Sequence, residues 1–90
     1  MDNSIHFSKR CAFEVGNMLG INWNKIDFEQ FHMGINIELE HGTRYGYMAN
    51  VTNDSPVTTG RIALAHLIEI SDYYTRLGNM ERIAAKKKKR

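Results

Sequence analysis

The spacing of apolar residues constrains the fold of this chain more than any other feature of its sequence. Apolar residues recur at steps of three and four along most of its length, as in Phe28, Phe31, Ile35 and Leu39. This spacing places side chains on one face of an α-helix. No alternating apolar and polar run long enough to indicate a strand is present in the sequence. The sequence therefore predicts an all-α fold, a compact bundle of three to four helices.

Four segments carry the helical spacing. The expected helices cover residues 5–19, 28–41, about 58–70, and a last segment that starts after Ser71 and Asp72. The third segment is apolar almost all round, which is typical of a helix surrounded by others. It is therefore expected to be the buried central helix of the bundle.

Residues that begin and end helices set the expected boundaries. Asp27 is suited to cap the second helix, with Gln30 three positions later completing a capping box. Gly42 stands where a left-handed residue usually ends a helix. The stretch 43–57 is rich in Gly, Asn, Thr and Asp and is expected to form a long ordered loop, whose Asp54, Ser55 and Pro56 suit a turn or a helix start.

Length and charge limit the classes of function. The 90 residues, 42% of them hydrophobic and 24% charged, are enough for one domain with a modest core. A large catalytic apparatus is not expected in so short a chain. Of the twelve basic residues, five lie in residues 86–90, so residues 1–85 hold seven basic against ten acidic residues, a net charge of −3. We expect a single helical domain over residues 1–85, followed by a basic tail.

Cellular context is indicated by what the sequence lacks. Cys11 is the single cysteine, so no disulfide within the chain is expected. No apolar run approaches the length of about 20 residues that a membrane-spanning helix needs, and the polar first residues do not resemble a signal peptide. An intracellular location is therefore expected, without a membrane span.

Two pairs of ionisable residues stand out within the helical segments. His66 and Glu69 are three positions apart in the most apolar segment, and Glu38 and His41 have the same spacing in the second. Residues three apart project from the same side of a helix. Antiparallel packing of the two helices would bring the four side chains together, and Gly34, one turn before Glu38, would let another helix approach closely.

Two interpretations of these pairs stay open. Two imidazoles and two carboxylates suit one zinc or iron ion, and Glu40, Asp72 and Glu81 are the further carboxylates available. The commoner alternative is a structural network, in which His41 bonds the carbonyls that end its helix and Glu69 pairs with His66 or a nearby arginine. Tyr73 and Tyr74 could donate hydrogen bonds to either arrangement. The sequence indicates neither a nucleophile nor an open metal position, so an enzyme is the least supported class.

The basic tail suggests a different kind of partner. It consists of Lys86, Lys87, Lys88, Lys89 and Arg90. Such a cluster can bind nucleic acid in a salt-dependent way, and it can equally serve only to keep a terminus solvated.

Three stretches of the sequence resemble a known family. They are FHMGINIELEHGT (Phe31–Thr43), TNDSPVTTGRIALAHLIEISDYYTRL (Thr52–Leu77) and the ME that follows. They resemble an uncharacterised family of short proteins from bacteria, bacteriophages and large DNA viruses, and the similarity covers about Leu19 to Arg82. The resemblance implies no catalytic residues. It implies a virus-encoded accessory or virion protein, located in the host cytoplasm or in the virion.

The favoured hypothesis is a small non-enzymatic helical binding module for an undetermined protein partner or virion component, stabilised by one divalent metal. The second is a virion- or nucleic-acid-associated structural protein anchored by its basic tail. The third is a metal-dependent enzyme.

Overall fold

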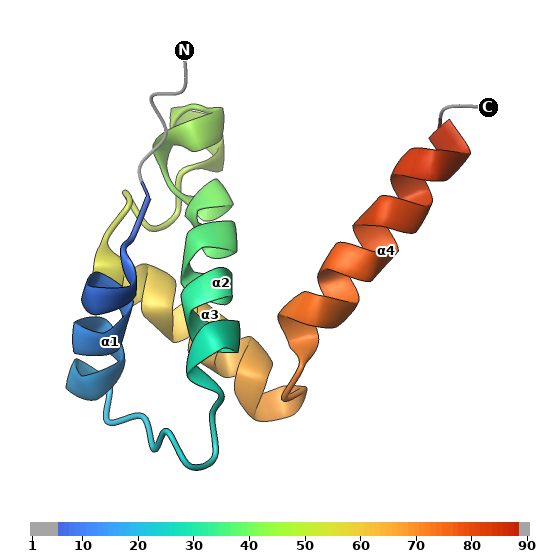
Figure 1. Ribbon diagram of the computed structural model, residues 1–90. Helices are drawn as coiled ribbons and strands as arrows, with labels where there is room; N and C mark the ends of the chain where they lie inside the picture. Colours follow the sequence, from blue (N-terminus) through green and yellow to red (C-terminus); the bar gives the residue numbers. More distant parts are fainter. Residues whose placement is uncertain (1–5, 89–90) are drawn as a thin grey trace.

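The computed structural model describes residues 6–88, which contain four α-helices, three short 3₁₀ turns and no strand (Figure 1). The helices are α1 (Lys9–Met18), α2 (Phe28–Ile37), α3 (Pro56–Glu69) and α4 (Tyr73–Lys88). The 3₁₀ turns are η1 (Glu38–His41), η2 (Thr43–Tyr45) and η3 (Tyr47–Ala49). The predicted all-α bundle is confirmed.

The core lies where α1, α2 and α3 meet. Its buried apolar side chains are Phe7, Ala12, Val15, Phe31, Ile35, Leu39, Ala63, Leu67 and Tyr74. Trp23 covers one end of this core, stacked on Phe13 and packed edge-on against Phe28. Its indole nitrogen donates to Asn17 Oδ1 at 2.9 Å, so both its apolar ring and its polar atom have partners.

The first helix is shorter than its apolar spacing predicted. It begins at Lys9, where the Ser8 side chain caps it by accepting a bond from the Cys11 amide, and residue 5 of the expected range lies outside the described residues. Phe7 is buried in an extended segment. The Asn36 side chain bonds both the amide and the carbonyl of Phe7, at 2.7 and 3.0 Å. A side chain of α2 therefore supplies the backbone bonds that another helical turn would have made.

The second helix begins as predicted and ends differently. The Asp27 carboxylate accepts from the Gln30 amide at 2.9 Å, so the predicted cap is confirmed. The Gln30 side chain does not complete a capping box, because it bonds α4 instead, accepting from the Tyr74 amide at 3.1 Å and donating to Thr75 Oγ1 at 2.6 Å. From Glu38 to His41 the α-helix tightens into η1.

The prediction of a left-handed cap at Gly42 is wrong. Its φ is −98° and its ψ is −138°, and it is buried. A Cβ atom at this position would lie 1.9 Å from Asp54 Oδ1. Asp54 comes this close because it accepts bonds from the Thr43 amide at 2.9 Å and from Thr43 Oγ1 at 2.6 Å. Glycine is required here by a close contact and not by its backbone angles.

The expected loop at 43–57 is ordered and shorter than predicted. It contains η2 and η3, and α3 already starts at Pro56, where the Ser55 side chain accepts from the Thr58 amide. Asn53 and Asp54 have positive φ values of 51° and 61°, which Asn and Asp tolerate better than most residues. Hydrogen bonds from Thr43 lower the pKa of Asp54, the side-chain hydroxyl contributing more than the amide.

Helix α3 is central by its contacts with α1 and α2, but only one face of it is buried. That face consists of Thr59, Gly60, Ala63 and Leu67. Ile68 on the other face is 71% exposed. A bundle this small has no further helix to cover that face, so the apolar character of α3 does not produce burial all round.

Helix α4 leaves the body of the protein after its first turns and extends outward as an arm (Figure 1). Tyr74 is buried and Leu77 half-buried, whereas all the residues from Gly78 to Lys86 are exposed. The radius of gyration is 13.8 Å, larger than the value of about 12 Å expected for a compact chain of this length. None of the helices in residues 6–88 is both long enough and apolar enough to cross a membrane.

Candidate functional site

A buried carboxylate, that of Glu38, lies at the centre of the cluster that the sequence singled out. Glu38 is only 3% exposed and directly follows the end of α2. The Tyr74 hydroxyl donates to Oε2 at 2.6 Å. His41 Nε2 lies 3.2 Å from Oε1, and His66 Nε2 lies 3.5 Å from Oε2. Residues from η1, α3 and α4 therefore converge on one carboxylate.

Tyr74 reaches Glu38 because the residue one turn before Glu38 is Gly34. A Cβ atom on Gly34 would lie 2.2 Å from the Tyr74 ring. The ring can cross α2 only where no side chain stands. Burial, together with the hydrogen bond to Glu38 and its negative charge, raises the pKa of Tyr74 far above its ordinary value. The phenol is thus held neutral and acts as a hydrogen-bond donor.

The two histidines are held in different ways. The His66 ring stacks on Tyr73, with ring centroids 4.2 Å apart and planes 3° from parallel. Its side chain is 34% exposed. The His41 side chain is 44% exposed, and its Nε2 also lies 3.7 Å from Glu40 Oε2. Of the two tyrosines expected to donate to the cluster, Tyr74 donates to Glu38, and Tyr73 stacks on His66 and fixes the orientation of its ring.

Glu69 is not brought to this cluster, unlike the other three residues predicted to be ligands. It is exposed at the end of α3, and none of the contacts of Glu38 within the described residues involves it. Each residue turns a helix by about 100°, so a step of three places Glu69 about 60° to one side of His66. His66 already stands at the edge of the buried face of α3, and the extra rotation carries Glu69 into solvent.

Glu40 takes the place that Glu69 was expected to fill. Among the residues the structure describes, one group has ligand atoms within 4.8 Å of one another and could hold a metal: Glu38, Glu40 and His41. His66 contacts the same carboxylate from its other oxygen and stands outside this trio. The sequence offered Glu40 only as one of three further carboxylates. A regular α-helix would point it away from Glu38, which it follows by two positions. The tightened turn η1 draws it closer.

The basic tail continues the last helix. Helix α4 extends to Lys88, and Lys86 is exposed on it. Lys89 and Arg90 lie outside the described residues.

Fold and site together define the class: a small all-α domain with a buried glutamate surrounded by histidine and tyrosine side chains. The sequence model of a family described as "Protein of unknown function (DUF5661)" matches residues 12–83, and the chain belongs to that family. The match begins seven residues earlier than the resemblance to short bacterial and viral proteins suggested. No curated protein and no solved structure matches the chain.

Proposed function

We propose that this protein is a small non-enzymatic helical binding module whose Glu38 cluster takes up one divalent metal, zinc or iron. The ligands are Glu38 Oε1, His41 Nε2 and Glu40 Oε2, and His66 lies on the far side of the carboxylate. The observation that carries the proposal is the spacing of these atoms around His41.

Metal ligands that share one ion have a characteristic separation. Zinc bonds to nitrogen and oxygen are about 2.0–2.2 Å long, so two ligands of a tetrahedral site lie about 3.3–3.6 Å apart. His41 Nε2 is 3.2 Å from Glu38 Oε1 and 3.7 Å from Glu40 Oε2. These distances agree with a shared ion after shifts of a few tenths of an ångström.

The surroundings of Glu38 favour the same interpretation. A buried carboxylate is costly unless hydrogen bonds or a cation compensate for the lost water. The Tyr74 hydroxyl occupies Oε2 at 2.6 Å, which leaves Oε1 facing the half-exposed His41. The Tyr74 bond would then orient the carboxylate from behind, as outer-shell partners of metal ligands do.

Metal content measured on tag-free protein tests the proposal. We expect about one equivalent of zinc or iron by elemental analysis, and a lower melting temperature after treatment with a chelator. His41→Ala should lose the metal. His32→Ala is the matched control, because His32 is also a half-buried histidine but lies within α2 and contacts the Phe7 carbonyl instead of Glu38. Metal-free protein that gains no stability from added zinc or iron would contradict the proposal.

Two glutamate variants distinguish the ligand set built from the geometry from the one expected from sequence. Glu40→Gln should weaken metal binding at least tenfold, since a carboxylate ligand is lost. Glu69→Gln should leave binding unchanged, because Glu69 is exposed on α3 away from Glu38. The opposite result would replace Glu40 with Glu69 in the ligand set.

A second candidate function is that of a virion- or nucleic-acid-associated structural protein anchored by residues 86–90. It is favoured by the position of Lys86 at the end of a helix that projects from the body (Figure 1). Truncation after Ala85 should abolish retention on DNA or RNA, and retention by the full chain should fall steeply with salt. Unchanged retention in the truncated protein would exclude this function.

A further inference from the structure

The outer part of α4 carries an apolar stripe that its own chain leaves uncovered. Met80, Ile83 and Ala84 continue the helical spacing beyond the half-buried Leu77, and all three are exposed. Met80 is 60% exposed and Ile83 is 57% exposed. A helix of so few turns is only marginally stable in water without packing on one face. The stripe therefore indicates a contact outside this fold.

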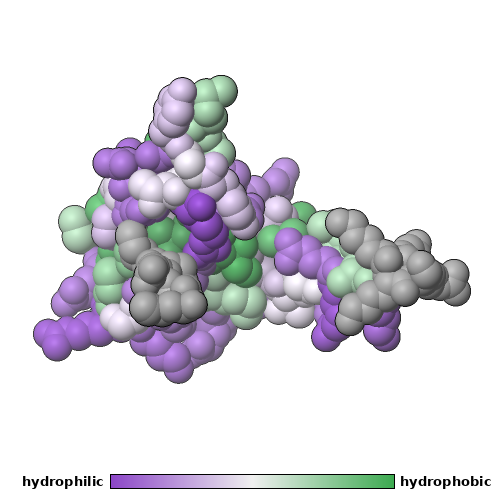
Figure 2. Space-filling model, turned by 90° about the horizontal axis from the view of Figure 1, so that it is seen from above, coloured by the Kyte–Doolittle hydropathy of each residue, from purple (hydrophilic) through white to green (hydrophobic). Residues whose placement is uncertain are grey.

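The charge of the chain is divided sharply between α4 and the body. Residues 73–90 contain seven of the twelve basic residues and one of the ten acidic ones, a net charge of +6. Residues 1–72 hold the remaining five basic and nine acidic residues, a net charge of −4. In the space-filling view, α4 is an arm with hydrophilic and apolar surface side by side (Figure 2). A basic amphipathic helix thus projects from an acidic body.

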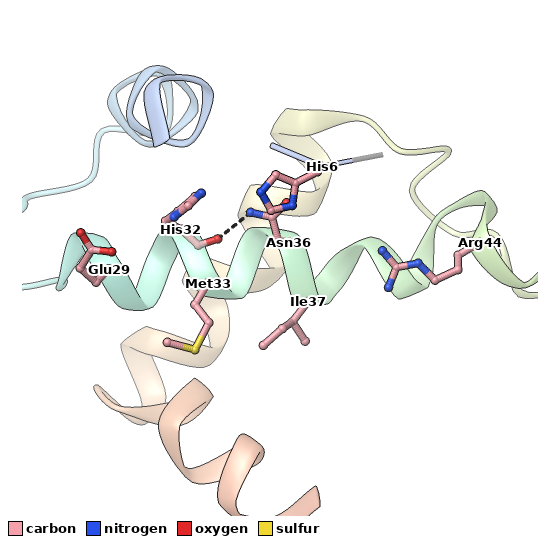
Figure 3. A pocket seen from close by; sticks show the side chains of 7 residues that line it. All are labelled: His6, Glu29, His32, Met33, Asn36, Ile37 and Arg44. Atoms are coloured by element: carbon pink, nitrogen blue, oxygen red, sulfur yellow. Dashed lines mark hydrogen bonds between the residues drawn. The ribbon is translucent and has the colours of Figure 1, made fainter. Parts of the chain in front are cut away.

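The body offers a groove that matches this helix. It has a volume of about 470 Å³ and runs along the outer face of α2, lined by His6, Glu29, His32, Met33, Asn36, Ile37 and Arg44. Met33 and Ile37, four residues apart, point to the same side of α2 (Figure 3). Glu29 lies at one end of the groove, where its side chain is 64% exposed and lies 3.5 Å from Lys9 Nζ of the same chain, and Arg44 lies at the other end.

From these features we propose that two copies of this chain associate, with α4 of each copy packed along the α2 groove of the other. Met80 and Ile83 would contact Met33 and Ile37, and the basic residues beside the stripe would face Glu29. The same two surfaces serve in both directions, so the assembly closes as a two-fold symmetric dimer.

The occupant is a second copy because the groove and the arm complement each other and cannot meet within one chain. Helix α4 contacts its own α2 through its first turns, where Tyr74 lies on Gly34, and then diverges from it (Figure 1). An anionic membrane or nucleic acid would attract the arm and repel the acidic body. It would also leave Met33 and Ile37 uncovered. A dimer covers both apolar surfaces and brings the basic arm of each copy next to the acidic body of the other.

Light scattering and cross-linking together test the dimer. The wild-type mass should be twice the 10.4 kDa of one chain, and Met80→Glu should return it to that of a single chain. For the cross-link, two single-cysteine proteins are prepared in a Cys11→Ser background, one with Met33→Cys and one with Met80→Cys. Their mixture should form an inter-chain disulfide on mild oxidation, since the two positions would lie in contact.

The matched control replaces Met33→Cys with Met18→Cys, a methionine 73% exposed at the end of α1. That mixture should remain uncross-linked. A single-chain mass at concentrations up to about 1 mM, equivalent to less than about 4 kcal/mol of association energy, would overturn the proposal. A dimer that cross-links equally through position 18 would overturn the assigned surfaces. If the protein is a monomer and sediments with anionic vesicles, the partner of the α4 stripe is a lipid surface and not a second copy.

Discussion

The first turns of α4 and its outer turns carry apolar residues at the same spacing, yet they lie in opposite environments. Tyr74 is 1% exposed, and Met80, six residues later, is 60% exposed. The difference lies in α2, where Gly34 leaves room for the Tyr74 ring. Spacing determines which face of a helix is apolar, and the neighbouring element determines whether that face is buried.

Two helical glycines show the same contrast. A Cβ atom on Gly34 would lie 2.2 Å from the Tyr74 ring, and one on Gly78, in α4, would have no neighbour within 4 Å. Identical substitutions at the two positions should therefore have opposite effects. The two substitutions therefore report how tightly α4 packs at its first turns, against Gly34, and at its outer turns, around Gly78.

The largest effect is expected for Gly34→Ala. The methyl group displaces Tyr74 and with it the hydrogen bond to Glu38. We expect a loss of about 3 kcal/mol in the free energy of unfolding, at the upper end of the usual cost of overpacking, although alanine alone would favour the helix by about 1 kcal/mol. Denaturant unfolding monitored by circular dichroism measures the loss.

Gly78→Ala is its control. No clash opposes the gain in helix propensity, so the variant should be more stable by up to about 1 kcal/mol, or unchanged if unfolding of the outer turns is not coupled to the core. A Gly34→Ala variant as stable as Gly78→Ala would show that Tyr74 is not held against α2.

Tyr74→Phe should have the next largest effect. It retains the ring and removes the donor to Glu38, which leaves a buried oxygen without its shortest hydrogen bond. The expected loss is about 2 kcal/mol. Tyr47→Phe is the control, since Tyr47 is 85% exposed and its substitution should change stability by less than about 0.5 kcal/mol.

The pH dependence of the free energy of unfolding is an independent test of the hydrogen bond between Tyr74 and Glu38. The pKa of Tyr74 is raised in the folded state above the ordinary value of 10.0. Its contribution to stability is therefore complete below that pH and is lost as the pH rises above it. Wild-type stability should fall on the alkaline side, and Tyr74→Phe should fall less. Identical alkaline curves would contradict the buried phenol.

The smallest effect is expected at Asp54, in the ordered loop before α3. The bonds from Thr43 lower the pKa of Asp54 below 3.8, so the stability it contributes is present above that pH and is lost as the pH falls through the lowered value. Asp54→Asn should make acid unfolding below pH 3.8 shallower. Thr43→Val in the same background should add little, because the two residues act through one contact. If the losses in stability caused by Asp54→Asn and Thr43→Val add fully, the two residues do not act through one contact.

Much of the fold could be predicted because short-range rules decide it. The Asp27 and Ser55 caps each involve an amide three residues away, and such contacts are visible in a sequence. The predictions failed where a distant residue intervened. Gln30 bonds α4 instead of its own helix end, and Gly42 makes room for Asp54, twelve positions later.

The candidate site was predictable to a similar extent. The sequence pointed to Glu38, His41 and His66 because polar residues in apolar helical segments need partners. It could not decide which of His66 and Glu69 faces Glu38, because both lie on α3 within one turn of each other. It also gave no reason to prefer Tyr74 over Tyr73 as the donor to Glu38. The position of Gly34 decides that choice once α4 is packed on α2.

By itself the sequence determined that the chain forms amphipathic helices, where most of them begin, and that an ionisable cluster interrupts their apolar faces. These properties depend on residues within one or two turns of each other. Only the tertiary structure decided that three segments meet on the Glu38 carboxylate, that Glu69 stays in solvent and that α4 leaves the body. Those outcomes depend on the angle at which each helix crosses its neighbours, and the spacing of residues along one helix is compatible with several such angles.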